Sequence, residues 1–406
     1  MSNRLLGEKR KFIRSFDGAL ALLLGLGVVI VLSLILAVPA LFVPKDSVWY
    51  VIINTAPLQF GLIGLYLVFM RKAKIDYFAS VGLKKPPTLA GLLIPPVVFV
   101  CIFATLLACT AYADLLSLTG YVTPGTADGT AVLDNLTANN AGEVVLYTVG
   151  IALLPAFGEE LLFRGLLLNG TKKIGTVFAV LLNGALFALY HMNPDQLIHQ
   201  FVLGVVLAYF VLRTGSLWVG IIGHFSNNAI ALIFEFTRFD FELAIPDRAV
   251  YALAVPVVLL FLAGVTLLAD AVTGNIRNNL FVRLFRGQKR GGAAAARADT
   301  GGAAFVGRDA NDLRYRAEYD AAVGELYAKK TWVPLPPHNT ADPVSVTEAR
   351  EAADAEYNHR VAAQIRSKRT LAIVILAVTA GAYALMWLIA FVMGVMEGAG
   401  ITVPGL

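Results

Sequence analysis

The stretch that decides the fold covers residues 143–168 and reads EVVLYTVGIALLPAFGEELLFRGLLL. A helix needs about 20 mainly apolar residues to cross the hydrocarbon layer of a bilayer, and this run is long enough. Glu159, Glu160 and Arg164 lie inside it. A charged side chain near the bilayer centre costs roughly 3 kcal/mol or more, so such residues usually face a protein interior and act there. The stretch therefore predicts a transmembrane helix with a functional face.

Similar apolar runs recur along the chain. The 406 residues are 57% hydrophobic and only 15% charged, and the mean hydropathy is +0.70, well above that of a soluble domain. We predict an all-α, polytopic transmembrane helical bundle of eight to nine spans, with a cytoplasmic extension of linker and helix. Two shorter segments meet at Asn193-Pro194, so the runs on either side of it are the least regular. The predicted spans are 18–43, 48–70, 88–113, 143–168, 174–192, 196–213, 216–235, 250–269 and 371–395.

The distribution of basic residues predicts the orientation. Lys and Arg accumulate in the short cytoplasmic loops of membrane proteins. Basic residues cluster before the first run, between Arg4 and Arg14, and after the second, between Arg71 and Lys85, whereas 114–142 has none. We therefore expect a multi-pass protein of the plasma (cell) membrane with its N-terminus in the cytoplasm.

The fourth run carries an acidic pair and its own counter-ion. Glu160 and Arg164 are four residues apart with the acid nearer the N-terminus, which favours an ion pair within the helix. Glu159 points about 100° away around the axis, so it has no partner in its own helix. An unpaired carboxylate in an apolar setting suits a general base. The alternative is that both acids only bond to neighbouring helices.

The fifth and seventh runs contribute imidazoles. Phe187 precedes His191 by one helical turn, so its ring can pack beside the imidazole and exclude water. His224 and Asn228 are also four residues apart and project from one face of an apolar helix, with Asn227 close to that face. A His and an amide together can donate hydrogen bonds to an oxygen that becomes negative in a transition state. The alternative is a polar pair that joins helices.

Three motifs of this chain resemble, in order and spacing, those of the CPBP family of CAAX-protease and bacteriocin-processing intramembrane endopeptidases: Glu159-Glu160-x-x-x-Arg164, Phe187-x-x-x-His191 and His224-x-x-x-Asn228. The resemblance spans about 143–235. It implies hydrolysis of a peptide bond within the membrane. Glu159 and His191 would activate a water, and His224 with Asn228 would form the oxyanion hole. Glu160 and Arg164 would support them.

The resemblance leaves the cofactor open. We favour a mechanism without metal, because no His-Glu-x-x-His helix is present and no further carboxylate or Cys ligand is evident. Zinc held by Glu159, His191 and His224 is the alternative, since three such ligands plus a water form a normal catalytic zinc shell.

The expected partners are the lipid bilayer and a membrane-embedded peptide or protein substrate that enters between helices. No nucleic-acid partner is expected. Two other classes of function stay open: a non-catalytic bacteriocin-immunity or scaffold protein, and a proton-coupled transporter. The transporter is less favoured because no inverted repeat or pair of broken helices is evident.

The depth of the site is not fixed by the runs. At 1.5 Å per residue, Glu159 and His224 lie within about 10 to 20 Å of the cytoplasmic face, whereas His191 would lie nearer the other side. A tilted or late-starting fifth helix would bring the three residues level.

The runs divide the chain into five parts. In the basic cytoplasmic part, residues 277–290 mix aromatic, aliphatic and basic side chains, which suits anionic lipid, although simple stop-transfer charge explains them equally well. A Gly- and Ala-rich linker at 291–304 is expected to precede helices near 309–330 and 345–369. The parts are 1–142 (N-terminal transmembrane helices and external loop), 143–235 (CPBP-like catalytic core helices), 236–269 (an additional transmembrane helix), 270–370 (cytoplasmic linker and helical segment) and 371–406 (C-terminal transmembrane helix).

Overall fold

The fold is seen in a computed structural model. It describes the chain in two units, residues 1–286 with 375–406 and residues 287–374, and the helical bundle belongs to the first. The described residues are 13, 15–45, 47–122, 136, 138–172, 175–238, 247–279, 282 and 343–400, with the backbone alone at 247 and over 343–369.

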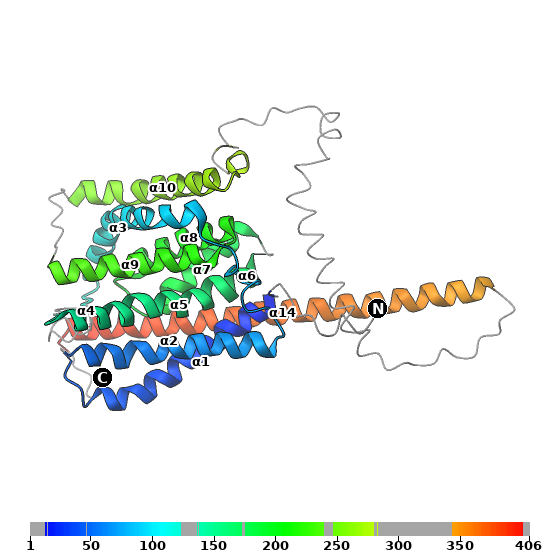
Figure 1. The fold of residues 1–406 in the computed structure, drawn as a ribbon, viewed down its shortest axis with the longest axis horizontal. Coiled ribbons are helices and arrows are strands. Elements are labelled where there is room, and N and C mark those ends of the chain that lie inside the picture. Colours follow the sequence, from blue (N-terminus) through cyan, green and yellow to red (C-terminus); the bar gives the residue numbers. More distant parts are fainter. Residues whose placement is uncertain are drawn as a thin grey trace. The chain divides into compact units, whose positions relative to one another are not determined.

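The described residues form the predicted all-α polytopic bundle and include no strand (Figure 1). Eight of the described helices are long and apolar enough to cross a membrane. They are α1 (Ser15–Ala40), α2 (Val48–Lys72), α3 (Thr88–Ser117), the composite helix Ala141–Thr171, α8 (Leu197–Thr214), α9 (Leu217–Thr237), α10 (Asp247–Val272) and the Thr370–Gly398 part of α14 (Pro343–Gly398).

The run expected to form a ninth span is a shorter helix, α7 (Thr176–Tyr190). Its 15 residues extend about 22 Å at 1.5 Å per residue, less than the roughly 30 Å of a hydrocarbon core. The helix ends because Met192 takes a left-handed backbone conformation with φ of 50°, and Pro194 follows. The described residues therefore hold eight helices of spanning length, one fewer than the nine predicted runs.

The helix that carries the acidic pair is irregular. Pro155 has no N–H, and its ring crowds the carbonyl of Ile151 four residues earlier, so a regular α-helix is interrupted there. Two π-helical segments flank the pair, and such segments are frequent at functional sites. The pieces are α4 (Ala141–Tyr147), η2 (Thr148–Leu153), α5 (Leu154–Glu160), η3 (Leu161–Leu168) and α6 (Asn169–Thr171).

Side-chain amides from other helices bond to carbonyls of this irregular helix. Asn228 of α9 donates from Nδ2 to the Ile151 carbonyl at 3.0 Å, and Asn183 of α7 donates to the Phe163 carbonyl at 2.8 Å. Buried backbone groups need such partners because no water reaches them in a membrane. These bonds fix α7 and α9 against the segment that carries Glu159.

Small residues bring α7 and α8 into close contact. A Cβ atom on Gly204 would lie 2.8 Å from the Gly184 Cα, and one on Gly184 would lie 2.9 Å from the Phe201 carbonyl oxygen. Close approach at small residues is a common way for membrane helices to pack. The contact holds the C-terminal end of α7, where His191 lies, against the bundle.

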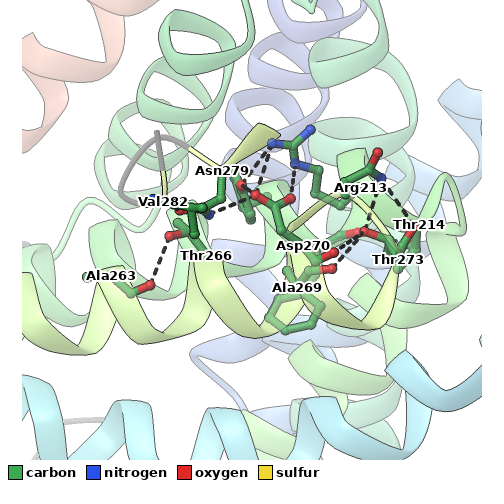
Figure 2. A network of polar contacts seen from close by, with 12 residues as sticks. Arg213, Thr214, Ala263, Thr266, Ala269, Asp270, Thr273, Asn279 and Val282 are labelled. Carbon is green, nitrogen blue, oxygen red and sulfur yellow. Dashed lines mark hydrogen bonds and ion pairs between the residues drawn. The ribbon is translucent and has the colours of Figure 1, made fainter. Parts of the chain in front are cut away.

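A buried polar network joins the ends of α8 and α10 (Figure 2). Asp270 has no exposed surface, and its Oδ1 lies 2.7 Å from Arg213 Nε. Its Oδ2 accepts hydrogen bonds from Tyr209 Oη at 2.9 Å and from Asn279 Nδ2 at 2.8 Å. Asn279 follows η4 (Ile276–Asn278), so the network fixes how the chain leaves α10.

The expectations for the basic segment meet the structure only in part. Of the proposed lipid-binding residues 277–290, only 277–279 and 282 are described, and 291–304 and 309–330 lie outside the described residues. The helix expected from 345 begins at Pro343 and continues into the last span as α14. A helix over 345–369 and a separate span over 371–395 were expected, but no Gly or Pro lies between them, and the backbone forms one helix.

Replacing Asp270 tests the importance of the network. Asp270→Ala leaves the Arg213 charge without its partner, so the free energy of unfolding should fall by about 3 kcal/mol. Unfolding in mixed micelles measures the change. Glu235→Ala is the matched control, because the Glu235–Arg238 pair at 3.1 Å is partly exposed, and it should cost less than about 1 kcal/mol. Equal losses would contradict the role given to the network.

Candidate active site

Three of the four predicted catalytic side chains meet at one oxygen, Glu159 Oε2. The Nε2 atom of His224 lies 3.9 Å from it and the Nε2 atom of His191 lies 4.0 Å from it. The three residues come from α5, from the C-terminal end of α7 and from α9. Both distances are too long for direct hydrogen bonds, which extend to about 3.2 Å, and suit one water held between the groups.

Each imidazole is oriented through its other nitrogen. His191 Nδ1 lies 2.8 Å from the Phe187 carbonyl oxygen, and because a carbonyl only accepts, Nδ1 carries the proton and donates. His224 Nδ1 lies 3.3 Å from Glu160 Oε1 and donates in the same way. In the neutral rings, both Nε2 atoms therefore face Glu159 as acceptors.

Glu159 is held on one side only. Its Oε1 accepts a hydrogen bond of 3.0 Å from Gln59 Nε2 of α2, whereas its buried Oε2 has no hydrogen-bond partner. A buried polar atom without a partner is costly, and such an atom indicates the place of a water or a substrate group.

Glu160 and Arg164 form the predicted ion pair, at 2.5 Å and with no exposed side-chain surface on either. Arg164 also donates to the Gly204 carbonyl at 3.3 Å, and its guanidinium lies 4.3 Å above the Phe187 ring, a cation–π contact. Gly220 of α9 leaves room for the pair, since a Cβ there would overlap Glu160 Oε2. A buried pair needs such additional contacts to offset its desolvation.

Aromatic rings enclose the imidazoles. The Phe187 ring centroid lies 4.7 Å from that of His191 and 5.5 Å from that of His224. Phe163 also packs against Phe187, with ring centroids 5.2 Å apart. The expected contact of Phe187 with His191 is confirmed, and the same ring also orients His224.

The short α7 brings His191 level with Glu159. At 1.5 Å per residue, about 18 Å of helix separates Glu159 from Thr171, and about 22 Å separates Thr176 from His191. The two helices run in opposite directions from the turn between them, so the residues meet. The arrangement corresponds to the second possibility raised by the sequence, in which the residues lie level, since His191 Nε2 is 4.0 Å from Glu159 Oε2.

Asn228 lies one turn beyond His224 and makes different contacts. Its Nδ2 donates to the Ile151 carbonyl at 3.0 Å, and its Oδ1 accepts from Asn227 Nδ2 at 3.1 Å. One of the two N–H groups of the amide is thus bound to the backbone of η2. The structure brings Glu159, His191 and His224 together. Asn228 is held by its hydrogen bond to the irregular helix.

Two polar residues of this region are absent from the predicted site. Gln59 bonds to Glu159, and His199 Nε2 lies 2.9 Å from Asn227 Oδ1. Both lie in predicted spans. A polar side chain within a span usually faces the protein interior and acts there, and this argument applies to them as it does to Glu159. Gln59 gives no spacing signal, because its partner is 100 residues away in the sequence.

The side chains do not have the spacing of a zinc site. Ligand atoms around a tetrahedral zinc ion lie about 3.4 Å apart at normal bond lengths, whereas Glu159 Oε2 is 3.9 and 4.0 Å from the two nitrogens. Within the described part of the chain, no three His, Cys, Asp or Glu side chains are arranged to hold a metal ion.

Residues 141–230 match the family model described as type II CAAX prenyl endopeptidase Rce1-like. This match relates the segment to the CAAX-protease family. Comparison of the chain with curated proteins and with solved structures gives no match. The CAAX-protease segment contains Glu159, His191, His224 and Asn228, whereas Gln59 comes from outside it. With its apolar helices, this makes the chain a multi-pass membrane protein.

Replacing each acid with glutamine should distinguish the contributions of the two carboxylates to stability. Glu160→Gln leaves the buried Arg164 without a counter-ion, so the free energy of unfolding should fall by about 3 kcal/mol or more. Glu159→Gln removes a carboxylate that faces no fixed cation, so stability should stay the same or rise. Unfolding of the purified variants in mixed micelles measures both changes. Similar losses in the two variants would contradict this assignment.

Proposed function

We propose that this chain is an intramembrane endopeptidase that hydrolyses a peptide bond in a membrane-associated peptide or protein. The observation that carries the proposal is the unpartnered Glu159 Oε2, which faces the Nε2 atoms of His191 and His224 at 4.0 and 3.9 Å. The CAAX-protease family implies a protease. The mechanism is inferred from the geometry of these side chains.

In the proposed first step, Glu159 and His191 hold a water by hydrogen bonds. Glu159 accepts a proton as the water oxygen attacks the carbonyl carbon of the scissile peptide. The proton then passes to the leaving nitrogen as the C–N bond breaks, giving a carboxylic acid and an amine. Gln59 and the Phe187 carbonyl keep the two side chains in place, at 3.0 and 2.8 Å.

His224 and Asn228 are proposed to stabilise the oxygen that becomes negative. For this role the Nε2 atom of His224 must carry a proton, while its Nδ1 stays bound to the Glu160 carboxylate at 3.3 Å. Asn228 has a second N–H beside the one bound to Ile151. Preorganised donors of this kind are often a large part of catalysis.

The expected location is the plasma membrane with the N-terminus in the cytoplasm, as the basic loops indicate. The bilayer is then the surrounding partner, and the substrate reaches the site from within it. Binding of anionic lipid by residues 277–290 stays a prediction.

Loss of Glu159 or His191 should abolish cleavage. Glu159→Gln and His191→Ala should each lower the rate on the order of a hundredfold or more, because each removes a group that activates the water. Whole-cell proteomics of membrane-protein fragments, compared with wild type, measures this and identifies the substrate. Glu235→Gln, at a partly exposed surface glutamate, is the matched control.

Other outcomes would favour the alternatives. Fragments that persist in both variants contradict the protease. A cellular phenotype that survives Glu159→Gln would indicate a scaffold or immunity protein, and substrate flux in proteoliposomes without a cleaved product would indicate a transporter.

Removal of metal separates the two mechanistic hypotheses. Because the three side chains are spaced for a water, activity should survive exhaustive chelation, and purified protein should hold zinc well below one ion per chain. Elemental analysis and the cleavage assay measure the two quantities. Stoichiometric zinc with loss of activity on chelation would establish the zinc alternative instead.

A further inference from the structure

Helix α14 carries two buried hydrogen-bond donors that have no partner. Tyr383 has no exposed surface, and neither its Oη nor the Nε1 atom of Trp387 has a hydrogen-bond partner. The residues are four apart, so they lie on one face of the helix, one turn from each other. Both belong to the part of α14 that is grouped with the bundle.

Ring contacts place this face of α14 beside the catalytic histidine. The Tyr383 ring centroid lies 6.0 Å from that of Tyr190, which lies 5.6 Å from that of His191. Further along α14, Trp387 stacks on Phe391 at 5.8 Å. Tyr383, the first of the two unpartnered donors, therefore contacts the ring of Tyr190, which itself contacts His191.

A second contact fixes α14 to the loop that follows His191. Tyr121 stacks on Phe391 with centroids 5.7 Å apart, and its Oη donates to Asp195 at 3.0 Å. The backbone N–H of Val122 donates to the Gly394 carbonyl at 3.1 Å. Contacts at Tyr190 and at Asp195 thus hold α14 on both sides of the His191 turn.

These donors are not explained by membrane anchoring. Tyr and Trp are common at the membrane interface, where the polar end of the ring meets water. Tyr383 instead lies near the middle of the Thr370–Gly398 span and is enclosed by protein. A donor in that position remains unsatisfied unless a bound molecule accepts its hydrogen.

The chemistry of the donors specifies what binds there. The Trp Nε1–H group can only donate, so its ligand must offer an acceptor. A transmembrane substrate must be unwound around the scissile bond, and its carbonyl groups then lose their helical partners. Residues 383 and 387 are about 6 Å apart along the axis of α14. Carbonyls two residues apart in an extended chain are about 6.8 Å apart and point the same way.

We infer that Tyr383 and Trp387 form a substrate-binding subsite that donates hydrogen bonds to carbonyl oxygens of the unwound substrate peptide next to the cleaved bond. The inference rests on the proposed function. α14 lies outside the CAAX-protease segment 141–230, so part of substrate recognition comes from the remainder of the chain.

Phenylalanine substitutions test the subsite while keeping an aromatic ring. Tyr383→Phe and Trp387→Phe, made in the full chain in lipid vesicles, are assayed with a synthetic peptide that spans the Glu159-dependent cleavage site. Each should raise KM roughly tenfold, the effect of about one hydrogen bond, with kcat little changed. The thermal midpoint of Tyr383→Phe without substrate should stay the same or rise, because an unsatisfied donor is removed and the ring is kept.

The controls keep the same chemistry at exposed positions. Tyr251→Phe removes a hydroxyl that bonds to Asp114 at the surface, and Trp49→Phe changes an exposed ring; both should keep the wild-type KM. An unchanged KM in the two α14 variants, or a fall in their thermal midpoint that matches the loss of activity, would overturn the subsite alone. A wild type that makes no Glu159-dependent fragment would overturn the proposed function, and the subsite with it.

Discussion

The buried ion pair of Glu160 with Arg164 is the interaction on which the rest of the site depends. It joins α5 to η3 at 2.5 Å, and Arg164 extends the contact to the Gly204 carbonyl of α8 and the Phe187 ring of α7. Glu160 also bonds to His224 of α9. Because Arg164 is committed to Glu160, the adjacent Glu159 keeps one oxygen unpaired inside an apolar bundle.

Backbone irregularity is the second requirement. Pro155 interrupts the helix before the acidic pair, and the π-helical segments on either side of α5 change which way the following side chains point. Amides from other helices then bond to carbonyls of this segment. Asn228 combines this task with its proposed place in the oxyanion hole, so one side chain links the fold of the irregular helix to the chemistry.

Local spacing predicted what lies within one helical turn. The Glu160–Arg164 pair and the Phe187–His191 contact follow from residues four apart, and the apolar runs predicted the helical bundle. The contacts of Gln59, His199 and Tyr383 could not be found in this way, because they depend on how distant helices pack. The run over 174–192 was also expected to cross the membrane, but α7 covers only Thr176–Tyr190 before Met192 and Pro194 end the helix. The position of His191 beside Glu159 depends on how α7 packs against the irregular helix, which spacing along the sequence does not give.

The central claim is that one water is held between Glu159 and the two imidazoles. An experimental map of the wild-type protein, at a resolution that shows ordered water, tests it most directly. The account predicts density about 2.8 Å from Glu159 Oε2 and from His191 Nε2, with His224 Nε2 facing it. Side chains that point apart toward lipid, or that close directly on one another with no water between them, would contradict the account.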